Sequence, residues 1–211
     1  MNAKLQSPGL RACLRKTHES EAAEVLASIY DEQCNLAIWR RQLPGNILRT
    51  RTDWLNDVSR LALLQEVSTQ QAQIDVQALL APYHPPQEMV DDIACVVDMY
   101  GCLFDTSYVG LRLRMLSSAM CPRFHVDHVT CRLITTLVGG GTQWLPQASL
   151  LLSDLTPGAK SAQNPSPFHT LACSDVALLK GSAWPGNENG AIMHRSPPVA
   201  PGDKRLVLTL D

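Results

Sequence analysis

The hydrophobic period changes near residue 107, and this change limits the fold more than any other feature of the chain. Beyond it, Leu111, Leu113 and Met115 alternate with Arg112 and Arg114, the two-residue repeat of a half-buried β-strand. Short strands separated by Gly, Pro, Ser and Asn clusters, with no long helix, predict a sandwich or barrel. Further strands are expected over residues 123–128, 132–138, 142–145, 176–179, 191–194 and 205–210.

The first half has helical spacing of its apolar residues instead. We expect a helix from Ser20 to about residue 30, and a second one capped by Thr52 whose apolar residues run to residue 62. A third has a continuous apolar stripe over residues 89–102, preceded by two prolines that suit a first helical turn. Residues 35–41 are a candidate strand. The Pro-rich segment 146–170 has no periodicity and is expected to be a long surface loop.

Composition narrows the class of protein. Hydrophobic residues make up 45% and charged residues 18%, which predicts an ordered globular chain. The seven cysteines are odd in number and never spaced as C-x-x-C, so we expect neither a disulfide framework nor a zinc ribbon, and a reducing compartment fits best. No stretch approaches the roughly 18 apolar residues of a membrane span. These features predict a cytoplasmic protein without a membrane partner.

The formal net charge of -2 conceals an asymmetry between the halves. Residues 1–106 carry 9 basic and 14 acidic side chains, whereas residues 107–211 carry 9 and 6. This excess is too small for a nucleic-acid surface, but it suits a pocket for a small anion. Three arginines, at positions 112, 114 and 132, lie on the expected strands. Each is either a solvated charge or a side chain that faces inward. An inward-facing one would point to an acidic substrate.

A possible metal site lies in the second half. His125 and Asp127 in FHVDH are two residues apart, so on a strand both side chains point to the same side. His194 in AIMHRSPP is the leading third ligand. Two histidines and one carboxylate on one face of iron leave three positions open, as an oxygenase needs. The competing interpretation is that His125 is an ordinary histidine hydrogen-bonded to a neighbour.

Other residues have alternative interpretations. Cys121 and Cys131 flank the H-x-D pattern and are either thiolate ligands of a zinc site or small buried hydrophobes. Trp144 and Trp184 either line a substrate mouth or pack in the interior. Glycines 139–141 are expected to form a tight turn, because no Lys-Ser or Lys-Thr follows as in a phosphate loop.

The order of motifs resembles the core of the Fe(II)/2-oxoglutarate-dependent oxygenase superfamily. The resemblance covers about residues 107–211, and the whole chain also resembles an uncharacterised bacterial family of unknown function. The matching motifs are FHVDHV, GGTQW, MHRSPP and the arginine-led strand RLVLTL. Many relatives have a hydroxyl residue two positions after this arginine, where Val207 stands here. An upstream tyrosine that often assists the cosubstrate is also not obvious, and Arg112 or Arg114 is the candidate replacement.

The resemblance implies a metal centre and a cosubstrate. It implies that His125, Asp127 and His194 bind Fe(II) as the catalytic centre, and that Arg205 pairs with the distal carboxylate of 2-oxoglutarate. Thr209 shares the face of Arg205. A buried guanidinium needs an anion, so without the cosubstrate we expect sulfate, another carboxylate or an acidic side chain beside it, with Asp203 and Asp211 as candidates.

The fold expected is mainly β with helices, a double-stranded β-helix of jelly-roll or cupin type over residues 107–211. Residues 1–106 are expected to form a helical region that packs on this core and supplies no metal ligand. The expected function is a hydroxylase-type Fe(II)/2-oxoglutarate oxygenase. One alternative is a non-enzymatic protein of the same fold that binds zinc or another divalent metal, with a metal-homeostasis or partner-binding role. Another is a cupin-like iron enzyme without 2-oxoglutarate.

Overall fold

The structure is a computed structural model that describes residues 15–147 and 167–211. Its strands are β1 (Lys16–Ser20), β2 (Cys34–Trp39), β3 (Ala62–Ser68), β4 (Tyr108–Leu116), β5 (Cys131–Val138), β6 (Gln143–Leu145), β7 (His169–Thr170), β8 (Val176–Lys180), β9 (Met193–Arg195) and β10 (Arg205–Leu210). Its helices are η1 (Ala23–Tyr30), α1 (Gly45–Asp57), α2 (Ala72–Leu80), η2 (Ala81–Tyr83) and α3 (Gln87–Phe104).

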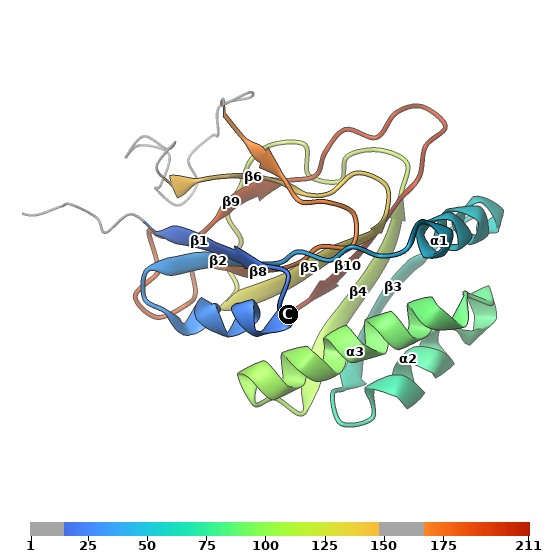
Figure 1. Ribbon diagram of the computed structural model, residues 1–211, viewed down its shortest axis with the longest axis horizontal. Coiled ribbons are helices and arrows are strands. Elements are labelled where there is room, and N and C mark those ends of the chain that lie inside the picture. Colours follow the sequence, from blue (N-terminus) through green and yellow to red (C-terminus); the bar gives the residue numbers. More distant parts are fainter. Residues whose placement is uncertain (1–14, 148–166) are drawn as a thin grey trace, which may run out of the picture.

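Two sheets face each other, and helices cover the outer side of the larger one (Figure 1). The large sheet has the order β1-β2-β8-β5-β10-β4-β3, and the small one has the order β7-β6-β9. An isolated antiparallel bridge adds His125 beside β9. From β4 onward, the chain passes back and forth between the sheets, so that β4, β5, β8 and β10 fill one sheet and the intervening segments fill the other. This is the strand order of a double-stranded β-helix, and it confirms the predicted fold.

The main core lies between the large sheet and α3. Apolar residues at helical spacing put Met89, Ile93, Val96 and Tyr100 on the buried side of α3, which confirms the helix predicted over residues 89–102. The strands contribute the facing residues, including Leu208 of β10. A second, smaller apolar cluster fills the space between the two sheets. The catalytic candidates lie on that inner side.

The first half is less helical than expected, because β1, β2 and β3 all join the large sheet. Strand β2 confirms the candidate at residues 35–41. The predicted helix from Thr52 to residue 62 is wrong in its extent: α1 starts at Gly45 and ends at Asp57, and Leu61 and Ala62 lead into β3. A short apolar run fits a helix or a strand, and here the pairing of β3 with β4 makes it a strand. The domain division at residue 106 stays a prediction.

Most predicted strands of the second half are present, and one is not. Residues 123–128 form no strand; within them only His125 pairs, in the bridge to His194. Most of the loop expected over residues 146–170 lies outside the described residues, and its end forms β7. Within the described chain, no helix has the length and apolar character needed to cross a membrane.

Candidate metal centre

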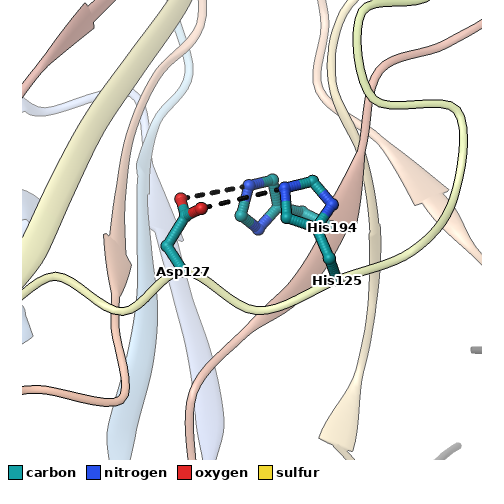
Figure 2. Close-up of side chains that lie close together, drawn as sticks. All are labelled: His125, Asp127 and His194. Atoms are coloured by element: carbon teal, nitrogen blue, oxygen red, sulfur yellow. Dashed lines mark ion pairs between the residues drawn. The ribbon is translucent and has the colours of Figure 1, made fainter. Parts of the chain in front are cut away.

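His125, Asp127 and His194 lie close together, and their side chains point toward one another (Figure 2). One ligand atom from each lies within 4.8 Å of the others. The Asp127 carboxylate is 3.7 Å from Nε2 of His125 and 3.3 Å from Nε2 of His194. The close-up shows both imidazoles on the same side of the carboxylate. The three predicted ligands therefore converge, although the first two are not on a regular strand.

Backbone pairing holds the two histidines side by side. The amide of His125 donates to the carbonyl of His194 at 3.0 Å, and the amide of His194 donates back at 2.9 Å. Their ring centroids are 4.6 Å apart. Asp127 is fixed separately, since its carbonyl accepts hydrogen bonds from the amide and hydroxyl of Ser182 at 3.0 and 3.2 Å. The arrangement is thus set by main-chain hydrogen bonds and by the hydroxyl of Ser182.

Both imidazoles direct Nδ1 toward a backbone carbonyl and Nε2 toward Asp127. Nδ1 of His125 lies 3.0 Å from the carbonyl of Arg123, and Nδ1 of His194 lies 3.3 Å from the carbonyl of Ile192. A carbonyl only accepts, so each Nδ1 carries a proton, and Nε2 of each ring is directed toward Asp127. Burial, with the nearby His194 next in importance, lowers the pKa of His125 and favours its neutral form.

Arg132 holds the carboxylate of the site. Its Nη1 donates to Oδ2 of Asp127 at 2.6 Å, and its Nε donates to Oδ2 of Asp211 at 2.9 Å. Asp211 also pairs with Arg112. Burial by itself would raise the pKa of Asp127, but the hydrogen bond and charge of His194, together with Arg132, outweigh it and lower that pKa to about 2. The carboxyl is therefore an anion at neutral pH.

Arg205 lies deeper between the sheets, with 2% of its surface exposed. Its Nε donates to the carbonyl of Gly140 at 2.7 Å, and its Nη2 donates to the hydroxyls of Thr136 and Thr142 at 3.1 and 3.0 Å. Burial lowers its pKa to about 10. The expectation of an acidic side chain beside it is wrong, since no described carboxylate pairs with Arg205 and Asp211 pairs with Arg112 and Arg132 instead. Asp211 directly follows β10, six residues after Arg205, at the metal end.

Trp144 links the metal centre to Arg205. It lies directly opposite His194 in the β6–β9 pair, so their side chains share one face. It also shares the inner side with Thr142, two residues earlier, whose hydroxyl bonds Arg205. The indole is 5% exposed, and its Nε1 is buried without an acceptor among the described residues. Among the described residues, the interior thus contains an N–H donor without an acceptor and a cation without a carboxylate partner.

The remaining candidates lie elsewhere. Burial raises the pKa of the Cys131 thiol, the opposite of what a thiolate ligand requires, and the cluster of possible ligands in the described chain includes no cysteine. His128 is exposed and bonds the Ser182 hydroxyl. Trp184 packs against Tyr30 on the helical side. Thr209 shares the inner face with Arg205 and lies opposite Arg112, but its hydroxyl forms no hydrogen bond within the described chain.

No local pattern in the sequence indicates the role of Arg132. An arginine five residues after Asp127 and at the start of an inner strand is compatible with a solvated charge, and only the fold brings it to the carboxylate. The same holds for Asp211, which reaches Arg132 because β10 pairs with β5. These two residues are the functional contacts that the motif alone could not supply.

Fold and site together define a double-stranded β-helix protein with a candidate two-histidine, one-carboxylate metal centre. The family model described as protein of unknown function (DUF1826) matches residues 20–211, and the chain belongs to this family. No curated protein matches the chain.

Several solved structures of 2-oxoglutarate oxygenases are similar to this chain at low identity. A dioxygenase for auxin oxidation from Arabidopsis thaliana, solved in complex with 2-oxoglutarate, has 9% identity and a TM-score of 0.49, with 93% of this chain and 91% of that one covered. A rice dioxygenase for auxin oxidation has 15% identity and a TM-score of 0.43, covering 80% of this chain and 63% of that one. A Pseudomonas putida prolyl-4-hydroxylase has 14% identity and a TM-score of 0.42, covering 88% and 95%. These distant likenesses do not carry an activity to this chain.

Proposed function

We propose that this protein is an Fe(II)/2-oxoglutarate-dependent oxygenase of the hydroxylase type, with His125, Asp127 and His194 as its iron ligands. The observation that carries the proposal is the occurrence of this ligand set together with a buried arginine, Arg205, on the same inner side, which has no carboxylate partner in the described part of the chain. The ligand set accounts for a metal. The arginine accounts for a second, anionic group that binds with it.

The donor set fits ferrous iron. Two neutral imidazoles and one carboxylate, all presented from one side, are the ligands that non-haem Fe(II) oxygenases use, and they leave positions open for other ligands. Each imidazole is oriented through its Nδ1, and the carboxylate is oriented through Arg132. Such outer hydrogen bonds are the usual support of metal ligands. Zinc binds the same ligand types, so binding of 2-oxoglutarate is the property that distinguishes an oxygenase from a non-enzymatic metal-binding protein.

The interior fits a ligand that has a distal anion. A fully buried guanidinium without a carboxylate partner is costly, and a carboxylate between Arg205 and the Thr136 and Thr142 hydroxyls would remove that cost. The indole Nε1 of Trp144 is a further unused donor between Thr142 and His194. Arg205 would hold the distal carboxylate of 2-oxoglutarate, and Thr209 lies on the same face nearer the metal end.

The bound iron, with 2-oxoglutarate and dioxygen, supplies the oxidising power to hydroxylate a C–H bond while 2-oxoglutarate is converted to succinate and carbon dioxide. The protein residues have positioning tasks. His125, Asp127 and His194 fix the reaction centre, and Arg205 sets the direction of the cosubstrate. The apolar cluster that includes Ile134 and Val207 excludes water from the inner side.

The test is an anaerobic titration with Fe(II), with and without 2-oxoglutarate, on wild-type protein and on Arg205→Met and Arg205→Lys. We expect a charge-transfer absorption only when iron and 2-oxoglutarate are both present. Arg205→Met should abolish it while Fe(II) affinity stays within about twofold, because the guanidinium is not a ligand. Arg205→Lys should retain weak binding, since it keeps the charge but loses the fork.

A wild-type protein that binds Fe(II) but shows neither this absorption nor 2-oxoglutarate-dependent succinate formation would contradict the proposal. That result would favour the non-enzymatic metal-binding alternative, or an iron enzyme that does not use 2-oxoglutarate. The metal content of protein purified without added metal then separates zinc from iron.

A further inference from the structure

The inner face of the large sheet continues past the metal centre onto β4 and β3. In the register of these strands, Arg112 lies opposite Leu64 on β3 and opposite Thr209 on β10, so all three share the inner face. Leu64 is 63% exposed and Tyr108, on the same side of β4, is 59% exposed. This part of the inner face is therefore open to solvent, and Figure 1 shows β3 and β4 at the opposite end of the large sheet from β1.

A chain of alternating charges connects this open face to the metal ligands. Asp127 pairs with Arg132, Arg132 pairs with Asp211, and Asp211 pairs with Arg112. Arg114 follows two residues later on the same face. Its only side-chain polar contact in the described chain is from Nη1 to the sulfur of Met120, at 3.8 Å. Three consecutive ion pairs, through Arg132 and Asp211, thus connect the Arg112 guanidinium to the carboxylate of the proposed metal centre.

Charge balance leaves this face cationic once the centre is loaded. The divalent metal, Asp127 and the dianion of 2-oxoglutarate together carry one negative charge, which Arg205 compensates. The side chains that remain on this face are Arg112, Arg114 and Arg132 against Asp211 and Glu66. Three cations and two anions leave one positive charge on this face. Glu66, the acidic residue on the facing part of β3, lies opposite Gly110 and forms no ion pair within the described chain.

We propose that Arg112 and Arg114 form the substrate-recognition site of the oxygenase, and that they bind a carboxylate or phosphate group on the substrate. This inference rests on the proposed function. Asp211 holds Arg112 in place, so part of the entropy cost of ordering its side chain is met before the substrate binds. Leu64 and Tyr108 add apolar and aromatic surface on the same face. The substrate class is therefore an organic oxyanion with an apolar body, with the anion anchored on β4 and the rest directed toward the metal.

The experiment uses four probes that share one apolar body: 4-phenylbutyrate, 4-phenylbutyl phosphate, 4-phenylbutanamide and 4-phenylbutylamine. Binding to protein loaded with Co(II) and 2-oxoglutarate is measured by calorimetry and by the Co(II) visible spectrum at constant ionic strength. At least one anionic probe should bind roughly tenfold tighter than the amide, because hydrogen bonds to charged groups are the stronger ones. The preferred anion identifies the substrate as a carboxylate or a phosphate.

Arg114→Gln is the decisive variant, since this guanidinium has no ion pair to lose within the described chain. It should reduce the preference for the anion to less than about threefold while Co(II) affinity stays unchanged. Arg49→Gln, which removes the same charge from the exposed surface of α1, is the matched control and should keep the preference.

Equal binding of all four probes, or an anion preference that survives Arg114→Gln, would overturn the inference. The same samples separate it from the proposed function. If the wild-type protein binds Co(II) but not 2-oxoglutarate, the proposed function fails, and calorimetry with the four probes still decides whether an oxyanion site exists on β4.

Discussion

His125 and His194 are direct partners in an antiparallel bridge, each donating its amide to the carbonyl of the other at 3.0 and 2.9 Å. The two residues are far apart in the sequence, and this pair of hydrogen bonds brings them together before any metal is considered. The Nδ1 contacts then orient both rings toward Asp127. Because the backbone presents the ligands already in place, metal binding needs little ordering of the chain.

Replacing one ligand should abolish tight metal binding without unfolding the protein. His125→Ala keeps the bridge, which is made by main-chain atoms, and removes one donor from a set of three. We expect the affinity for Co(II) to fall by more than the roughly 10- to 100-fold that loss of an outer hydrogen bond costs. His128→Ala removes the exposed imidazole next to Asp127 and should leave the affinity unchanged. Calorimetric titration checks both, and an equal loss in the two variants would contradict the assignment.

The motif predicted which residues meet at the site, but not how they are held. The strand expected over residues 123–128 is absent, because Asp127 is fixed by loop contacts to Ser182 and only His125 pairs with a neighbouring strand. The spacing of His125 and Asp127 in the sequence identified the pair, whereas the contacts to Ser182 join residues 55 positions apart. No local pattern contains such a contact.

Long-range pairing also explains what the sequence missed in the fold. Alternation predicted β4, β5 and β10 well, since their inner and outer faces differ in polarity. The helix predicted to residue 62 overlaps the start of β3, because Leu61 and Ala62 fit both periods and the pairing of β3 with β4 is invisible to local spacing. Arg132 and Asp211 gained their partners in the same way.

Arg132 should support metal binding by orienting Asp127. Arg132→Gln removes the hydrogen bond at 2.6 Å, and we expect Co(II) affinity to fall by roughly 10- to 100-fold. Removing the positive charge of Arg132 would by itself raise Co(II) affinity, because it ends the repulsion between the guanidinium and the metal ion. The side chains of Arg132 and Asp127 are 21% and 14% exposed, so solvent screens much of that repulsion. Arg123→Gln removes an exposed charge near His125 as the control. A rise in affinity on Arg132→Gln would show that repulsion dominates.

The turn before β6 requires glycine at position 141. A Cβ at Gly141 would lie 1.8 Å from the carbonyl oxygen of Leu171, and this contact is with backbone rather than a movable side chain. Gly141→Ala should therefore lower the free energy of unfolding by more than about 3 kcal/mol. Gly45→Ala is the matched control, because its Cβ meets nothing within 4 Å at the start of α1. Urea denaturation should show that variant unchanged or more stable by up to about 1 kcal/mol.

The indole N–H of Trp144 is a spectroscopic probe of the proposed cosubstrate position. Its buried Nε1 has no acceptor in the described chain, whereas Nε1 of Trp39 donates to Glu21 and that of Trp54 donates to Tyr83. A carboxylate bound between His194 and Arg205 would supply the missing acceptor. In a nitrogen-15 spectrum, the Trp144 indole N–H should shift downfield when 2-oxoglutarate is added to the protein loaded with Zn(II), while the signals of Trp39 and Trp54 stay in place.

Trp144→Phe assigns that signal and measures what the contact contributes. Phenylalanine keeps most of the apolar contact inside the barrel and removes only the N–H and part of the ring. The affinity for 2-oxoglutarate should fall by about tenfold, the effect of one hydrogen bond to a charged group. Metal affinity should not change, because the indole is not a ligand. Without ligand, the melting temperature of the variant should fall less than it does for an ordinary large-to-small core substitution. The reason is that the variant also removes a buried N–H donor that lacks an acceptor among the described residues. If the indole signal does not shift although the protein binds 2-oxoglutarate, the bound cosubstrate does not lie against Nε1 of Trp144, and the position proposed for it is wrong.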